Sequence, residues 1–238
     1  MRLGRLVAII LVLVPTWAAA IEVNGHVSAG GWFFGIDGTI EETDLDALDF
    51  DSIQGQPELE AGVTLGRRHH LDVSYLLIRR SEEGTAQGEV LGIVIFEDDV
   101  SIDLDVDYVR GHYGFSLVMN DWIDLEPFLE VGFLREATDI RNRTTGQREK
   151  QDDFAVFPLP GLAVAIAPAF PIGLEARATG IGLGQGHLID VEGGAEGRFG
   201  FVFLGVGYRY VDFRFEDGDR EVADLELSGV YVRGGARF

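Results

Sequence analysis

The residues best suited to hydrolytic chemistry are a histidine and several aspartates in two separate segments. His187 and Asp190 lie three positions apart, and Asp103 and Asp105 lie in an earlier segment. A histidine held by a carboxylate can act as a general base that activates water. On an extended strand, side chains three positions apart point to opposite faces, so His187 and Asp190 could pair only across a bend. We therefore predict that no catalytic site is formed here.

A second group of acidic residues could hold a metal ion. Residues 49–60 carry acids at the first, third and twelfth positions, which is the spacing of a calcium-binding loop. The fifth position is Ile53, and the sixth, where such a loop needs glycine, is Gln54. The pattern predicts a solvated acidic loop without a cofactor, and bridging by divalent cations is the alternative. The acids of this region are Asp44, Asp46, Asp49, Asp51, Glu58 and Glu60.

The elements that must position these residues are strands, because apolar and polar residues alternate along much of the chain. In residues 102–108 every even position is apolar except for the final tyrosine, and every odd position is a carboxylate. This period of two is typical of strands with two different faces. Alternation is broken at Tyr108 and Val109, which predicts a bulge or a change of phase there.

The pattern predicts ten strands, and eight is the alternative count. The even number favours an antiparallel barrel with both ends on the periplasmic side. Short connections are expected at residues 67–70, 119–121, 168–171 and around 200, and longer ones at 37–56, 81–99 and 141–153. The predicted strands are residues 21–36, 57–67, 71–80, 100–118, 122–140, 154–167, 172–182, 187–199, 203–216 and 222–238.

One segment competes with this topology. Residues 154–174 form a stretch of 21 residues without a charge, which is long enough for a transmembrane helix. Four prolines interrupt it, and each interior proline destabilises a helix by about 3 kcal/mol or more. A hairpin that turns at residues 168–171 is therefore predicted.

The N-terminus and the overall charge indicate the compartment and exclude several classes of protein. Residues 1–20 have the basic, apolar and small-residue regions of a cleavable signal peptide. The chain has no cysteine, which excludes a lipoprotein anchor, disulfides and thiol catalysis. Its net charge of −21 becomes about −23 when Arg2 and Arg5 are removed with the signal, so we expect no nucleic-acid partner.

The C-terminal segment, residues 230–238, resembles the final strand of small bacterial outer-membrane β-barrels. Val230 and Val232 alternate with polar or charged residues, and Phe238 is the terminal aromatic residue. The resemblance implies that the barrel-assembly machinery reads Val230, Val232 and Phe238 as an assembly signal. It also implies a Gram-negative, porin-like envelope protein: an all-β antiparallel transmembrane β-barrel, formed by residues 21–238, exported through the periplasm and located in the outer membrane.

Charged side chains in such a barrel need a location, because charge on the lipid face costs a few kcal/mol at mid-depth. We predict that they form an ionic network that fills the lumen, since arginine can satisfy carboxylates bidentately where water is scarce. Arginines lining open water are the alternative. The predicted network consists of Asp103, Asp105, Asp107, Glu126, Glu130, Arg177, Asp190, Glu192, Arg198, Arg209, Arg233 and Arg237.

Ten strands enclose little room for bulky solutes. The sequence therefore favours a non-enzymatic barrel with a filled, charged lumen and acidic extracellular loops, in a structural or surface-interaction role. The expected partners are outer-membrane lipid and lipopolysaccharide, with divalent cations at the acidic loops as an option, and we expect a monomer. A narrow channel for small ions is the first alternative, and a hydrolase at the outer rim, acting on lipid or peptide, is the second.

Overall fold

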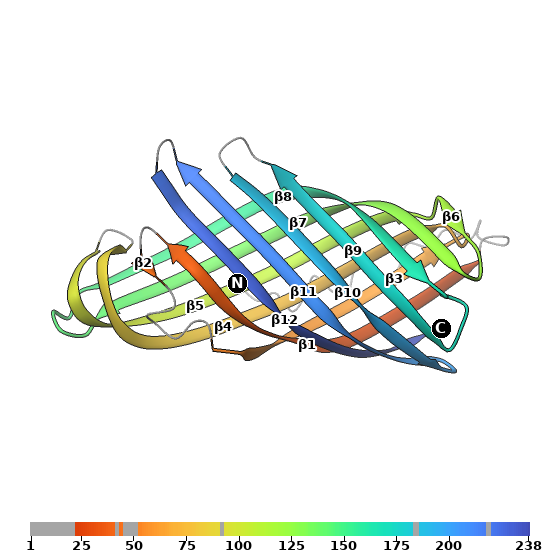
Figure 1. The fold of residues 1–238 in the computed structure, drawn as a ribbon, viewed down its shortest axis with the longest axis horizontal. Coiled ribbons are helices and arrows are strands. Elements are labelled where there is room, and N and C mark those ends of the chain that lie inside the picture. The colour runs from red at the N-terminus through yellow and green to blue at the C-terminus, as the bar shows by residue number, and fades with distance from the viewer. Residues whose placement is uncertain (1–21, 41–42, 45–51, 91–92, 183–185, 218–219) are drawn as a thin grey trace, which may run out of the picture.

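The described part of the chain forms a closed antiparallel barrel of ten long strands (Figure 1). The computed structural model describes residues 22–40, 43–44, 52–90, 93–182, 186–217 and 220–238. Two further strands of two residues each, β2 (Thr43–Asp44) and β6 (Val118–Met119), pair with β1 and β7. The long strands are β1 (Val23–Ile40), β3 (Gln54–Leu65), β4 (His69–Val90), β5 (Ile93–Phe115), β7 (Ile123–Asn142), β8 (Arg148–Ile166), β9 (Ile172–Gly182), β10 (Gly186–Phe199), β11 (Val202–Asp217) and β12 (Arg220–Arg237).

The barrel closes where the last strand pairs with the first. The β12–β1 ladder runs from the pair His26 and Arg237 to the pair Ile40 and Ala223. Gly25 and Phe238 extend it by exchanging two backbone hydrogen bonds. The predicted signal peptide and Asp46, Asp49 and Asp51 lie outside the described residues.

One end of the barrel has tight connections. Gly66 and Arg67 both have positive φ angles in the three-residue connection between β3 and β4, and Gly200 has a positive φ angle in the two-residue connection between β10 and β11. The predicted short connections lie at this end, which is the periplasmic end in barrels of this kind.

The opposite end differs from the prediction, because several expected loops are strands. β4 and β5 continue to Val90 and from Ile93, so most of residues 81–99 belongs to a long hairpin. β7 and β8 likewise reduce the expected loop at 141–153 to residues 143–147. The polarity of these segments predicts loops, but polar residues are also stable on strands that extend beyond a membrane.

The uncharged segment 154–174 forms the hairpin of β8 and β9. Pro158 and Pro160 lie in the part of β8 that pairs with β7 but not with β9, whose ladder with β8 begins at Gly161. A proline, which lacks the N–H donor, is tolerated where one side of a strand is unpaired. No helix among the described residues is long and apolar enough to cross a membrane.

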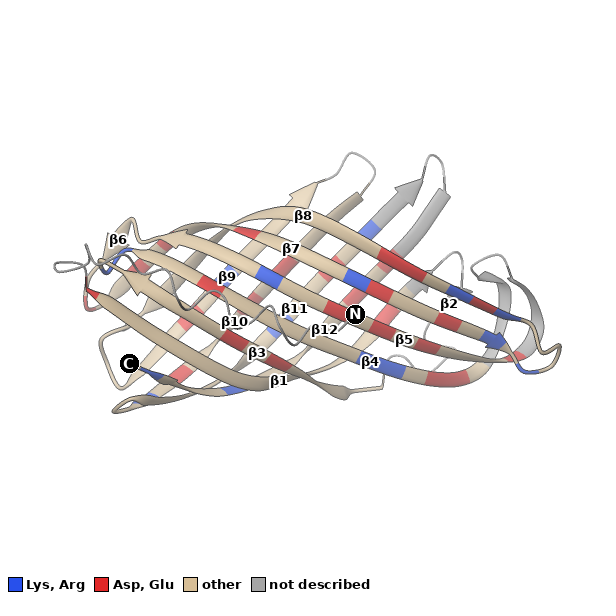
Figure 2. Ribbon diagram, turned by 180° about the vertical axis from the view of Figure 1, so that it is seen from behind, with Lys and Arg blue, Asp and Glu red and all other residues tan. Residues whose placement is uncertain are grey.

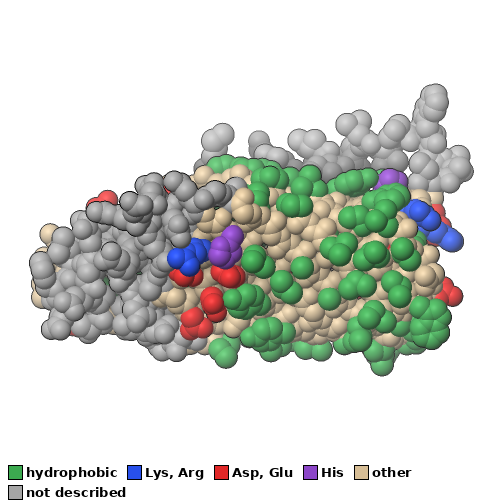
Figure 3. Space-filling model, turned by 45° about the horizontal axis from the view of Figure 1, so that its top comes forward, with side chains coloured by type: hydrophobic (Ala, Val, Ile, Leu, Met, Phe, Trp, Pro, Cys, Tyr) green, Lys and Arg blue, Asp and Glu red, His purple; other side chains and the backbone are tan. Residues whose placement is uncertain are grey.

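The outer surface changes character part way along the barrel. Outward positions are apolar from Leu71 to Leu77 on β4 and then polar or charged from Arg79. On β7 the same change falls between Phe133 and Arg135. The apolar band begins at the short-turn end and matches the hydrocarbon layer of an outer membrane, which is about 25 Å in height on such barrels. Figure 3 shows this band on one face, flanked by charged side chains, and Figure 2 shows charged residues continuing along β4 and β5 toward the long hairpins.

The inner surface changes in the opposite sense. On β5 the inward side chains are apolar or aromatic from Val100 to Tyr108 and polar from Arg110 to His112. The register of β5 with β4 and β7 is continuous through Tyr108 and Val109, so the predicted bulge or phase change is absent there. The broken alternation instead marks the level at which the surroundings of the strand change from water to lipid.

Candidate functional site

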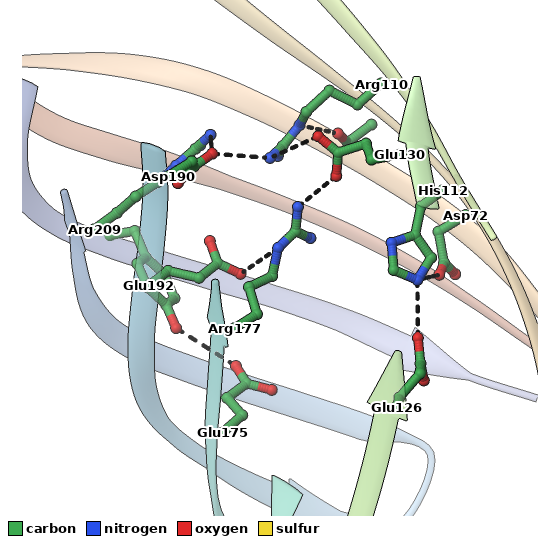
Figure 4. A network of polar contacts seen from close by, with 12 residues as sticks. Asp72, Arg110, His112, Glu126, Glu130, Glu175, Arg177, Asp190, Glu192 and Arg209 are labelled. Atoms are coloured by element: carbon green, nitrogen blue, oxygen red, sulfur yellow. Dashed lines mark hydrogen bonds and ion pairs between the residues drawn. The ribbon is translucent and has the colours of Figure 1, made fainter. Parts of the chain in front are cut away.

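Arg110 is the centre of a charged network inside the membrane-level half of the barrel (Figure 4). Its side chain projects from the inner face of β5, and the residue is 3% exposed. Its Nε donates a hydrogen bond to Ser74 Oγ at 2.9 Å, and its Nη2 donates to the Glu58 carboxylate. Its Nη1 lies 3.6 Å from Asp190 Oδ2 and 3.9 Å from Glu130 Oε1. One guanidinium therefore contacts carboxylates from three other strands.

Arg209 provides the second buried guanidinium. Its Nε and Nη2 donate to the two oxygens of Asp190 at 3.0 and 2.6 Å. Its guanidinium carbon lies 4.6 Å from the centre of the Trp32 ring, where a cation–π contact is favourable. Arg209 thus connects the ionic network to the apolar cluster on the extracellular side of it.

Further ion pairs extend the network toward the short-turn end. Arg177 donates to Glu130 Oε2 at 2.5 Å and lies 3.7 Å from Glu192. Arg198 and Arg237 each lie 2.7 Å from Glu196, whose side chain is 2% exposed. Arg233 pairs with Glu175. Because most of these carboxylates have an arginine partner, the charges in this part of the lumen largely compensate one another.

Histidines and carboxylates alternate along the wall near the short-turn end. His26 lies 3.0 Å from Glu60 and 3.6 Å from Asp72. His112 lies 3.8 Å from the other oxygen of Asp72 and 2.9 Å from Glu126. The Asp72 and Glu126 carboxylates lie over Gly62 and Gly114, so a Cβ at either glycine would displace the carboxylate beside it. Within the described residues, no group of three or more acidic or histidine side chains is arranged to hold a metal ion.

An apolar cluster, which we name the seal, fills the lumen on the extracellular side of the network. It includes Trp32 and Phe34, whose ring centres are 4.0 Å apart and which are 1% and 0% exposed. Beyond the seal, toward the extracellular end, Arg80 is buried and donates a hydrogen bond to the carbonyl oxygen of Ser52 at 3.0 Å. The seal consists of Trp32, Phe34, Ile36, Leu76, Ile78, Val100, Ile102, Val106, Ile140 and Tyr231.

Three residues of the predicted lumen network lie on the outside of the barrel. Asp103, Asp105 and Asp107 project outward from β5 beyond the apolar band, and Arg79 lies 3.2 Å from both Asp105 and Asp107. Their assignment to the lumen was wrong, because the inward positions beside them belong to the apolar seal. The other nine predicted residues project inward, and ion pairs connect them with one another or with further inward residues.

Sequence reasoning missed the residue at the centre of the network, together with several of its partners. Arg110 follows the broken alternation at Tyr108 and Val109, so its face could not be assigned from the pattern. Glu58 and Glu60 are counted among the acids of the predicted acidic loop, although the predicted strand 57–67 also contains them. They lie on β3 and project inward toward Arg110 and His26. Strict alternation with Leu59 and Ala61 was the signal that could have identified them. Because residues 54–60 belong to a strand, the calcium-loop pattern does not form a loop there.

The residues considered for hydrolysis are also separated. His187 projects outward and lies 3.2 Å from Asp212, whereas Asp190 projects into the lumen toward Arg209.

Outside the membrane, Asp139 accepts hydrogen bonds from Arg148 and Lys150, which hold the pKa of the Asp139 carboxyl well below its ordinary value. In the assembly-signal segment, Val230, Val232 and Phe238 are exposed on the outer face of the barrel.

Comparisons with known proteins support the fold. No family model matches the chain, and no curated protein matches it in sequence. The outer membrane protease OmpT from Escherichia coli is 9% identical, with a TM-score of 0.54, over 91% of this chain and 96% of that chain. The translocator domain of the autotransporter NalP from Neisseria meningitidis is 15% identical, with a TM-score of 0.46, over 92% and 88%. Ail of Yersinia pestis is 15% identical, with a TM-score of 0.42, over 91% and 99%.

The barrel and its apolar band define the class of protein. The described residues form ten long strands with the fold of the outer-membrane β-barrels, and the protein resides in the outer membrane. The identities are too low to transfer a role from any of these structures, so the role must be argued from the lumen and the outer surface.

Proposed function

We propose that the protein is a sealed, non-enzymatic outer-membrane barrel that holds a charged extension above the membrane for interactions at the cell surface. The observation that carries this proposal is the two-part filling of the lumen. Arg110 and its carboxylate partners cross the lumen at membrane level, and the seal around Trp32 and Phe34 fills it beyond them. A filled lumen favours a structural or binding role over transport.

The outer surface supports contacts with outer-membrane lipid and lipopolysaccharide. Arg79 and Arg135 are the first charged outward residues beyond Leu77 and Phe133, at the level where lipid phosphates begin. The row of Asp103, Asp105 and Asp107 lies at or beyond that level on β5 and is available to external partners or to bridging divalent cations. In this proposal the protein makes these contacts as a monomer.

A non-enzymatic role is supported by the placement of the candidate catalytic groups. His187 and Asp190 occupy opposite faces of β10, and Asp103 and Asp105 project away from the lumen. None of these carboxylates contacts His187 within the described residues, so His187 could act as a general base only with another carboxylate. His187 and Asp212 form such a pair on the outer surface. His187→Ala is therefore the variant that would test for a hydrolase.

Planar-bilayer recording distinguishes the sealed barrel from a narrow ion channel. We expect the refolded protein to insert without sustained ohmic conductance steps, because solvated ions cannot pass both the ionic network and the seal. Folding is verified by heat-modifiable gel mobility, and an open porin serves as the positive control for insertion. Sustained steps at neutral pH would favour the narrow channel and contradict the sealed lumen.

A further inference from the structure

The wall of the barrel is interrupted between β8 and β9. The ladder between these strands begins at the pair Gly161 and Thr179, so residues 148–160 of β8 pair with β7 alone among the described residues. β9 ends at Gly182. Figure 1 shows the extracellular ends of β9–β12 diverging from those of β4, β5, β7 and β8. We name this interruption the seam, and its borders are residues 154–160 of β8 and 180–182 of β9.

The seam begins at the level of the membrane. Residues 156–160 of β8 pair with residues 129–133 of β7, and the outward side chains of both stretches are apolar and belong to the apolar band. Arg135, opposite Phe154, is the first charged outward residue of β7 beyond this level. An unpaired strand edge is costly in hydrocarbon, because no water is present to satisfy its N–H and C=O groups. A seam at this depth is therefore stable only if its edge carries few such groups.

Two prolines meet this condition on the β8 edge. Thr179 Oγ1 donates to the carbonyl oxygen of Pro160 at 3.0 Å, so the backbone of Pro160 faces β9. Alternate residues of a strand face the same neighbour, so the backbone of Pro158 faces β9 as well. Pairing with Gly180 and Gly182 would need N–H donors at both positions, and proline has none. The prolines thus end the ladder and leave no N–H group unsatisfied there, which means that the sequence specifies the seam.

The inner surface behind the seam is apolar and only partly covered. Phe157 and Ile181 project inward from its two borders and are half-buried. The ring centre of Phe157 lies 6.0 Å from that of Tyr108, which packs against the seal. A Cβ at Gly182 would have no neighbour within 4 Å, so there is open space at this border. Among the described residues, β8, β9 and β10 contribute none to the seal. Apolar surface therefore continues from the lipid-facing band through the seam to the seal.

We propose that an acyl chain of a membrane lipid enters the seam from the side and packs against Phe157 and Ile181. The seam opens onto the apolar band, so the hydrocarbon layer is continuous with it. An acyl chain needs no hydrogen-bond partner, whereas an added peptide strand would need the N–H donors that Pro158 and Pro160 lack. This binding does not depend on the surface role of the outer extension. It is compatible with a sealed lumen, because the chain lies beside the seal and opens no path along the barrel axis.

Tryptophan fluorescence of the mature barrel, refolded into phosphatidylcholine vesicles with brominated chains, tests this proposal because bromine quenches an indole only at close range. Outside residues 1–20 the tryptophans are Trp32 and Trp122. In Trp122→Phe only Trp32 remains, which is 1% exposed behind continuous ladders and should emit equally in brominated and unbrominated vesicles. Adding Phe157→Trp places a second indole behind the seam. We expect brominated chains to quench most of the fluorescence that this indole adds.

The matched closing variant adds Pro158→Val and Pro160→Val. It supplies both missing N–H donors, so β8 can pair with β9 and the added tryptophan should regain its emission. Heat-modifiable gel mobility verifies that each variant folds. Equal emission of the added tryptophan in the two kinds of vesicle would overturn the proposal, and so would quenching that persists in the closing variant. Quenching of the added tryptophan by iodide, which stays in water, would also overturn it, because water rather than lipid would then occupy the seam.

Discussion

Replacing Arg110 with alanine is expected to lower the free energy of unfolding by about 3–5 kcal/mol. The variant removes the guanidinium that lies between Glu58, Glu130 and Asp190 while leaving these carboxylates in a poorly hydrated lumen. Breaking a buried pair from one side is costly, because the remaining charge has lost its partner. Urea unfolding of the barrel refolded into lipid vesicles, followed by tryptophan fluorescence, measures this loss.

Arg79→Ala is the matched control for this variant. Arg79 also contacts carboxylates, but its side chain is 42% exposed on the outer surface, so its loss should change stability by no more than about 1 kcal/mol. Adding Glu58→Gln to Arg110→Ala should restore part of the lost stability, since Glu58 is the carboxylate that Arg110 contacts most closely and Glu130 and Asp190 keep Arg177 and Arg209 as partners. Equal effects of the two single variants would show that Arg110 is as well hydrated as Arg79, and the filled lumen would be refuted.

Leu129→Arg is expected to destabilise the folded barrel by about 2–4 kcal/mol. Leu129 projects outward from β7, six residues from the start of the strand, and 48% of it is exposed on the outer face. In the membrane this surface contacts lipid tails, where an arginine loses its hydration. The same urea titration in vesicles measures the change.

Ala137→Arg provides the control on the same strand and the same face. Ala137 lies two outward positions beyond Phe133, next to Arg135, whose side chain is 56% exposed. An arginine there should change stability by less than about 0.5 kcal/mol. Comparable losses for both variants would mean that the apolar band does not end near Phe133.

The sequence predicted the barrel well because alternation is a local property of each strand. All ten predicted segments correspond to the long strands, and the short connections predicted at residues 67–70 and around 200 correspond to the turns at residues 66–68 and 200–201. Strand ends at the extracellular side were not predicted, because polar residues such as those of residues 81–90 are compatible with both loops and water-exposed strands.

The faces of the strands were harder to predict, and the errors have one physical cause. Alternation separates two faces but does not identify which of them meets lipid, water or the lumen. Asp103, Asp105 and Asp107 were placed inside because charge is excluded from lipid, yet at their level the surroundings are aqueous and the apolar face turns inward. Arg177 and Arg209 lie in the membrane-level part of the barrel, where charge is excluded from the lipid face. Their predicted position in the lumen therefore agrees with the observed placement.

The central claim is that the strands turn apolar side chains outward at the level of the membrane and inward beyond it. A cysteine scan along β5 tests this claim most directly. The chain has no cysteine, so single cysteines at residues 103, 105, 107, 109, 111 and 113 can each be labelled alone. In intact cells a membrane-impermeant maleimide should react at 103, 105 and 107 and fail at 109, 111 and 113, which face lipid. Failure at 103, 105 and 107, with reaction restored only after the membrane is dissolved, would contradict the account.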